Sequence, residues 1–239
     1  FQEKWIKSMY PNNKRSIIIP TEAQLKQLNA DKMLKMFKER FSDASDFTFV
    51  FVGNIDEKTM LPLIEKYIGG LPSSKGKKAE KWQDRSTPFA SGVVDETVYA
   101  GEANKGLMTI TFENDFDWSD RLATKALDNI CSIKLTETIR EELGGTYSPS
   151  FSLSYEKYPQ AKTTAMCYYT CDPTTVDKLT NATFEVLDKL IAEGPEVKDL
   201  DKVKEQLILE RKGQLEKNGF WLGQISGSRF YGYEMQTLE

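Results

Sequence analysis

Arg140 and Tyr147 are the residues of this 239-residue chain whose types and spacing best support chemistry; they stand seven apart in R-E-E-L-G-G-T-Y. A helix is expected to end before the two glycines and a strand to begin after them, which puts both side chains at one corner of a sheet. Both donate hydrogen bonds, so the pair could hold the carbonyls of an extended peptide. Spacing alone is also compatible with a purely structural role for both residues. Arg140 would then be a solvated residue at the end of a helix, and Tyr147 would lie at the edge of the apolar face of a strand.

The absence of histidine from the sequence excludes most catalytic arrangements. Zinc hydrolases commonly use two histidines one helical turn apart, and serine and cysteine nucleophiles commonly rely on a histidine base. A serine–lysine or paired-carboxylate mechanism stays formally open, but no spacing singles out such a pair. The three cysteines form no CxxC motif, so no metal site is predicted in this chain.

Charge and hydropathy narrow the classes of partner. The net charge is -4 and the lysines are spread among acids, which argues against nucleic acid. No run approaches the roughly 18 apolar residues of a membrane span, so no membrane partner is expected. Cys167 and Cys171 stand four apart on a predicted strand, about 13 Å between Cα atoms, too far for a disulfide. They and Cys131 are expected to be free.

The first part of the chain predicts a helix-strand-helix segment. Apolar residues recur at helical spacing over 29–41, F-T-F-V-F-V over 47–52 favours a strand, and Asp56 can cap a second helix that Gly69-Gly70 ends. Residues 73–91 are rich in lysine, serine and glycine and predict a linker. We therefore expect 1–72 to belong with a preceding domain of a longer protein, and 92–239 to form an α+β domain.

The second part predicts a two-layer α/β sandwich of the α+β class, in the order β-β-α-β-β-α-α. Its sheet is expected to be mixed but mostly antiparallel, with long helices on one face. The other face would carry Ser148, Ser150, Ser152 and Ser154, because the strand after Tyr147 alternates apolar and serine residues. The predicted strands cover 93–100, 107–113, 147–155 and 162–171, and the helices 118–143, 173–193 and 197–217.

Three motifs resemble the inverzincin family of zinc metallopeptidases, which includes pitrilysin-like and insulinase-like enzymes. R-E-E-L-G-G-T-Y-S resembles its arginine-plus-tyrosine motif. F-V-F-V-G-N-I-D followed by E-K-Y-I-G-G-L-P resembles its strand, Gly-x-x-Asp turn, helix and closing Leu-Pro. F-W-L and S-G-S-R-F-Y-G-Y look like the end of bacterial members that hold two homologous halves in one polypeptide. The resemblance spans about residues 29–235.

The resemblance implies that this chain is part of the C-terminal, non-metal-binding half of such an enzyme. The N-terminal half of the same polypeptide would hold the zinc with a His-x-x-Glu-His motif, and this chain would hold no cofactor. Arg140 and Tyr147 would contact the peptide substrate, Arg140 at a backbone carbonyl and Tyr147 at the oxyanion of the scissile bond. The chain would close the cleavage chamber and be inactive alone, and an extracytoplasmic, periplasmic location would suit a bacterial member.

Two other functions compete with this one. The chain could be a non-catalytic relative used for assembly, which would have no need of the Arg140 and Tyr147 pair. It could also be an unrelated α+β binding module, which a His-x-x-Glu-His helix upstream in the same reading frame would exclude.

Overall fold

The computed structural model describes residues 1–239 apart from 12, 14–18, 75–82, 84–87 and 236–239. The chain divides into two compact units, which are described separately. The first combines Phe1–Asn13 with Ser86–Lys212, and the second combines Lys14–Arg85 with Gly213–Glu239. Most of the predicted linker over 73–91 lies outside the described residues. The assignment of 1–72 to a preceding domain stays a prediction.

The first unit is built on an antiparallel sheet that has three strands within the described residues. These are β1 (Gly106–Asp115), β2 (Ser150–Glu156) and β3 (Lys162–Cys171), in the order β1-β3-β2. Cys167 in the central strand pairs with Ile110 on one side and Phe151 on the other, so these three side chains share one face. The serines at 150, 152 and 154 lie on the opposite face, as the alternation predicts.

The apolar face of the sheet is covered by α5 (Arg121–Leu135) and α6 (Val176–Glu193). The core between sheet and helices is formed by buried residues from every layer, namely Met108, Leu135, Ile139, Cys167, Tyr169, Cys171, Leu179 and Ala182. Tyr169 is the largest fully buried side chain, and its hydroxyl lies 3.4 Å from that of Thr183 on α6. The buried polar group is therefore paired where the two layers meet.

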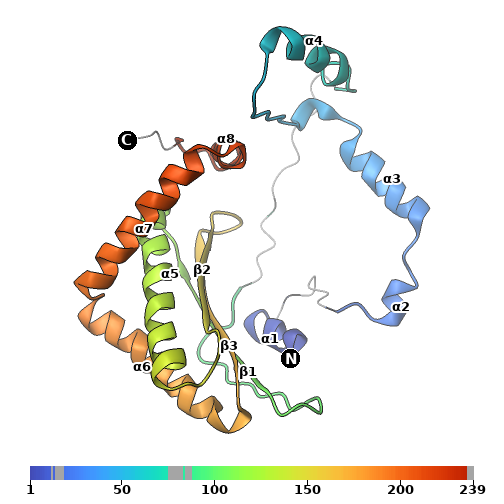
Figure 1. The fold of residues 1–239 in the computed structure, drawn as a ribbon. Coiled ribbons are helices and arrows are strands. Elements are labelled where there is room, and N and C mark those ends of the chain that lie inside the picture. Colours follow the sequence, from blue (N-terminus) through green and yellow to red (C-terminus); the bar gives the residue numbers. More distant parts are fainter. Residues whose placement is uncertain (12, 14–18, 75–82, 84–87, 236–239) are drawn as a thin grey trace. The chain divides into compact units, whose positions relative to one another are not determined.

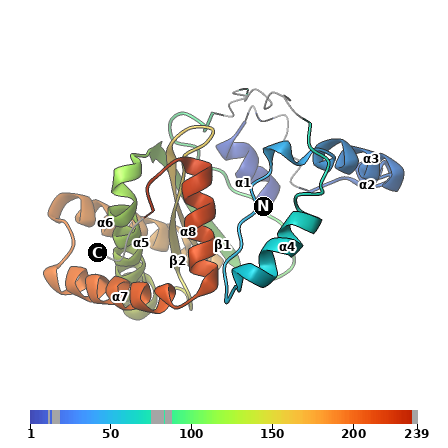
Figure 2. The same ribbon diagram turned by 90° about the horizontal axis from the view of Figure 1, so that it is seen from above.

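Two further helices of the first unit flank this core. The helix α7 (Val197–Leu215) buries Val203 and is tied to α5 by an ion pair of 2.8 Å between Lys125 and Glu210. The helix α1 (Gln2–Met9) lies on the other side of the sheet from α5 in both views (Figures 1 and 2). The indole of Trp5 donates there to the hydroxyl of Thr111, at 3.2 Å. The serine-bearing face is thus partly covered by the chain's own first helix.

The second unit is helical, with α2 (Glu22–Leu25), α3 (Ala30–Phe41), α4 (Glu57–Tyr67) and α8 (Asn218–Tyr231). The predicted cap at Asp56 is confirmed, because its side chain accepts from the amide of Lys58 at 2.9 Å, and Asn29 caps α3 by accepting from the amide of Lys32, also at 2.9 Å. A short 3-10 turn covers Ala44–Asp46 (η1) in this unit, and two others, Trp118–Asp120 (η2) and Pro173–Thr175 (η4), lie in the first unit. Among the described helices, none has the length and apolar character needed to cross a membrane.

The α+β class and the antiparallel sheet under long helices are confirmed, but two predicted strands do not form in the described chain. Residues 93–100 pair with no strand there, and Val93 and Tyr99 are 98% and 94% exposed. The run 47–52 is also unpaired, with Phe49 and Phe51 both exposed. β-branched and aromatic residues make both runs suitable for a strand. A strand forms only when a second strand supplies its hydrogen-bond partners, however, and neither run has such a partner among the described residues.

Candidate functional site

The corner that carries Arg140 begins with a π-helical segment, η3 (Thr136–Glu142), which continues α5 without a break. Its wider winding is seen in the amide of Leu143, which donates to the carbonyl of Thr138 five residues earlier, at 3.1 Å. Ile139 is fully buried in this segment, and the next residue, Arg140, is exposed. The segment is therefore held in the core on one side while it presents the guanidinium on the other.

Gly144 and Gly145 reverse the chain after the π-helical segment, each for its own reason. Gly144 has φ of +58°, a left-handed conformation that glycine adopts without strain. Gly145 has an ordinary φ but lies against Leu179 of α6, where an added Cβ would come 2.6 Å from Cδ1. The amide of Gly145 donates to the carbonyl of Ile139 at 2.9 Å. The reversal thus needs glycine at both positions, at Gly144 for its backbone conformation and at Gly145 for its close packing.

The structure brings the two predicted site residues together. The guanidinium carbon of Arg140 lies over the ring of Tyr147, 5.4 Å from its centroid. Tyr147 is 85% exposed and precedes β2 by three residues, so it lies in the turn rather than in the strand. Both donor groups are therefore open to a ligand at the same corner, with a cation–π contact between them.

Thr146 separates the reversal from Tyr147 and anchors it. Its side chain is 8% exposed, between a glycine and a tyrosine that are not buried. Its hydroxyl has no hydrogen-bond partner in the part of the chain that the structure describes. The backbone at Tyr147 is thus fixed by the burial of the residue directly before it.

The cysteines contribute no nucleophile. All three are free and buried, as the sequence predicts for the absence of disulfides. Burial, and then the nearby carboxylate of Asp128, raises the pKa of Cys131 to about 12. Burial, and then the neighbouring thiol of Cys131, raises the pKa of Cys167 to about 12 as well. Neutral thiols are poor nucleophiles and poor metal ligands, so these residues act as apolar core groups.

The described residues do not provide a zinc site. No group of three or more histidine, cysteine, aspartate or glutamate side chains is arranged among them to hold a metal ion. The sequence has no histidine, and its buried cysteines are neutral thiols. The chain's donor set therefore does not fit the zinc of a metallopeptidase.

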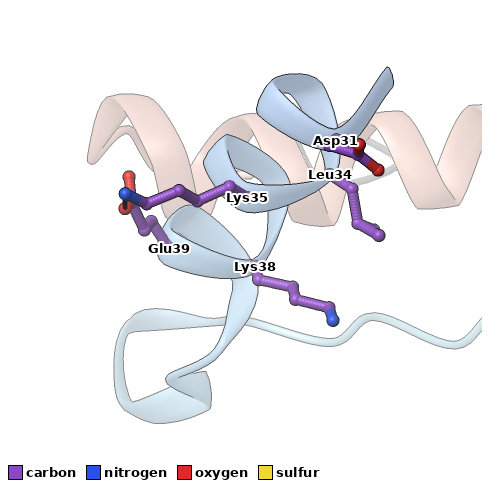
Figure 3. A pocket seen from close by; sticks show the side chains of 5 residues that line it. All are labelled: Asp31, Leu34, Lys35, Lys38 and Glu39. Carbon is purple, nitrogen blue, oxygen red and sulfur yellow. Dashed lines mark ion pairs between the residues drawn. The ribbon is translucent and has the colours of Figure 1, made fainter. Parts of the chain in front are cut away.

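Two hollows lie elsewhere. One of about 340 Å³ runs along a single helix, α3, where Lys35 and Glu39 turn toward one another at 3.9 Å while Leu34 and Lys38 point away (Figure 3). The other, of about 500 Å³, lies in the first unit between the sheet and helices α5 and α6, with an apolar lining. Sequence reasoning missed this second hollow, because side chains from five separate segments form its wall.

The sequence of the chain is similar to zinc proteases. The family described as peptidase M16 inactive domain matches residues 27–207. The probable zinc protease PqqL of Escherichia coli is 26% identical over 214 residues, which are 87% of this chain and 22% of that protein. The zinc protease PQQL-like of Arabidopsis thaliana is 25% identical over 217 residues, 85% of this chain and 23% of that protein. The chain thus spans less than a quarter of these relatives.

Solved structures share the fold. The crystal structure of the periplasmic protease PqqL from Escherichia coli has a TM-score of 0.77 and 24% identity, covering 95% of this chain and 25% of that one. A peptidase M16 inactive domain from Pseudomonas fluorescens has a TM-score of 0.66 and 18% identity, covering 98% of this chain and 55% of that one. Because the family match covers most of the chain, the protein belongs to the peptidase M16 inactive-domain family, the zinc-protease family that its motifs indicate.

Proposed function

We propose that this chain is the substrate-contacting, non-metal-binding part of a zinc-dependent metalloendopeptidase. It closes the cleavage chamber, contacts the backbone of the peptide substrate and is inactive alone. Its partner is an N-terminal zinc-binding half of the same polypeptide, in line with the chain's span of about a quarter of the PqqL structure. An extracytoplasmic location accords with that of the Escherichia coli relative, which is a periplasmic protease.

The observation that carries the proposal is the exposed pair at the corner, with the guanidinium of Arg140 5.4 Å from the centre of the Tyr147 ring. An extended peptide that passes this corner meets a guanidinium and a phenol on side chains in contact with each other, and both groups can donate hydrogen bonds to backbone carbonyls. Tyr147 donates its hydroxyl to the oxyanion that forms at the scissile carbonyl, and Arg140 donates to a carbonyl beside it. A donor aimed where charge develops contributes about 3–4 kcal/mol in a water-excluded site.

The buried residues next to Arg140 and Tyr147 favour a substrate-binding role for the pair over a purely structural one, in which Arg140 is only a solvated helix end. Ile139 and Thr146, the residues directly before Arg140 and Tyr147, are both buried. Gly145 packs directly on Leu179. Donors that are held by packed neighbours lose little conformational entropy when they bind, which is the condition for an effective binding or oxyanion site.

We also propose that residues 1–72 pack against a preceding domain of a longer protein. Within 1–72, α3 and α4 leave apolar side chains exposed, among them Met33, Phe37 and Leu61 at 56–58%. Together with the unpaired strand-prone run over 47–52, these surfaces suit packing against a preceding domain of a longer polypeptide. Residues 92–239 then form an α+β peptidase-like C-terminal domain, joined to it by the linker over 73–91.

The test is Tyr147→Phe in the full-length protein. The substitution removes one hydroxyl from an exposed ring, so folding is expected to be unaffected. If the hydroxyl donates to the oxyanion, kcat and kcat/KM fall together, by on the order of 100-fold, with KM nearly unchanged. An unchanged kcat would remove the catalytic role of Tyr147 and favour a non-catalytic assembly function for the domain.

A further inference from the structure

An ion-pair cluster with a buried centre lies at the entry to the π-helical segment. The ammonium of Lys134, in the last turn of α5, lies 2.7 Å from Asp199 Oδ2, 2.8 Å from Glu196 Oε1 and 3.1 Å from Glu137 Oε2. The side chain of Lys134 is 15% exposed and that of Asp199 is 5% exposed. Lys134 and Asp199 are therefore held by each other rather than by solvent, whereas the side chains of Glu137 and Glu196 are 41% and 52% exposed.

The carboxylates around Lys134 come from two separate parts of the fold. Glu137 is the second residue of the π-helical segment, whereas Glu196 precedes α7 and Asp199 lies in its first turn. The amide of Asp199 donates to the carbonyl of Glu196 at 3.1 Å, so the connection before α7 is itself an ordered turn. Lys134 therefore ties the start of η3 to the start of α7.

The ammonium keeps its charge in this setting. Burial alone would lower the pKa of Lys134, but its close contacts with the carboxylates of Asp199, Glu196 and Glu137 outweigh burial and raise the pKa above its ordinary value. A hydrogen bond from Lys134, and then one from Lys198, lowers the pKa of Glu196 to about 2. Lys134 and Glu196 are thus both charged at neutral pH, and the geometry of the cluster is maintained by several close contacts with the ammonium.

We infer that Lys134, paired with Asp199, is a positioning residue that fixes the direction of Arg140, an inference that rests on the proposed function of Arg140. A π-helical turn is rare and persists only where its surroundings hold it. Buried Leu135 and Ile139 hold the core side of this stretch at both ends, and the contacts of Lys134 hold the side toward Glu196 and Asp199, where the winding would otherwise be free to relax toward ordinary α-helix. The contacts of Lys134 with Glu137 and Asp199 fix that winding at its first residues, six positions before Arg140.

The chain offers a matched control. Lys125 and Glu210 form another ion pair between α5 and α7, at 2.8 Å, but their side chains are 46% and 39% exposed. This pair joins the same two helices and lies away from the π-helical segment. A substitution at Lys125 therefore measures the general effect of losing a contact between α5 and α7, without disturbing the entry to η3.

The experiment measures hydrogen–deuterium exchange and steady-state peptide cleavage in the full-length protein. The variants are Lys134→Met, which keeps the length of the side chain, Lys134→Arg, which keeps the charge, and the control Lys125→Met. Because Lys134→Met leaves Asp199 as a buried unpaired charge and could prevent folding, Lys134→Met combined with Asp199→Asn is measured too. Each kinetic comparison is repeated in an Arg140→Ala background.

We expect Lys134→Met, or the double variant, to raise exchange of the amides over 138–145 by on the order of tenfold, with little change elsewhere. KM should rise several-fold at nearly constant kcat, Lys134→Arg should restore most of it, and Lys125→Met should change neither quantity. In the Arg140→Ala background the added effect of Lys134→Met should vanish, since both changes remove the same contact.

Unchanged exchange over 138–145, or an equal rise in Lys125→Met, would overturn the inference, as would a full additional loss in the Arg140→Ala background. The two proposals fail separately. If exchange rises in the Lys134 variants while Arg140→Ala leaves KM unchanged, the positioning role stands and the substrate-binding role of Arg140 falls.

Discussion

Gly145 approaches Leu179 so closely that α6 and the reversal after the π-helical segment share one packing surface. An added Cβ would lie 2.6 Å from Cδ1 of Leu179 and 3.0 Å from Cγ, and Leu179 is 1% exposed in the core. A methyl group at this position therefore has to displace either a packed leucine or the backbone that leads to Tyr147.

Gly145→Ala is accordingly expected to destabilise the protein by about 1–3 kcal/mol, the usual range for overpacking a well-filled core. Chemical denaturation followed by circular dichroism measures the change. Gly213→Ala is the matched control, because Gly213 lies inside helix α7 with nothing within 4 Å of an added Cβ. It should be neutral or stabilising by up to about 1 kcal/mol. Equal stability in the two variants would contradict the close packing on Leu179.

Arg140→Ala in the full-length protein should raise KM for peptide cleavage, because a donor that holds a ground-state carbonyl contributes to substrate affinity. The expected rise is about tenfold, with a smaller change in kcat. Arg140→Lys keeps the charge but loses the planar group that stacks on Tyr147, so it should restore affinity only in part. Steady-state kinetics with a fluorogenic peptide separate these effects. Wild-type KM in Arg140→Ala would show that the guanidinium does not contact substrate.

The stability of the domain should fall in acid through Glu196. Its pKa is lowered from 4.5 to about 2, first by the hydrogen bond from Lys134 and then by that from Lys198. A carboxyl group with a depressed folded-state pKa stabilises the fold fully above its unfolded pKa, and that contribution is lost as the pH falls from about 4.5 to about 2. Urea unfolding at a series of pH values should therefore show a shallower acid decline in Glu196→Gln. Parallel curves for the two proteins would argue against this coupling.

The isolated 239-residue chain should bind no stoichiometric zinc and cleave no peptide, since it has no histidine. Elemental analysis of the purified chain and a peptide-cleavage assay with and without a chelator are the measurements. About one zinc per chain together with chelator-sensitive cleavage would contradict both the absence of a metal site here and the division of roles between two halves.

The sequence predicts the sheet best where alternation is strong and the partner strand is near in the chain. The strand predicted over 162–171 is observed with the same bounds, and it pairs with β2 as expected. The strand predicted from Tyr147 begins three residues later, at Ser150, in keeping with the irregular start that Pro149 favours. Residues 93–100 and 47–52 show the limit, because their composition suits a strand but pairing depends on residues elsewhere.

The sequence predicts which residues form the candidate site, but it does not predict the packing and ion-pair contacts that hold them. Residue types and the two glycines place Arg140 and Tyr147 at one corner, which the contact between them confirms. The π-helical winding leaves no mark in a pattern of three- and four-residue steps, so 118–143 is predicted as one ordinary helix. The contact of Lys134 with Asp199 joins residues that are 65 positions apart, and no local rule pairs them.

Because of the π-helical segment, the position of Arg140 depends on the number of residues between Lys134 and Arg140 as well as on their identity. A π-helical turn holds about one residue more than an α-helical turn, so deleting one residue between Lys134 and Arg140 would let ordinary winding resume and would remove the geometry that η3 gives to the corner. The R-E-E-L-G-G-T-Y motif would survive intact in such a protein. Among related domains, a gap in this stretch is therefore as informative about substrate contact as a replacement of Arg140 itself.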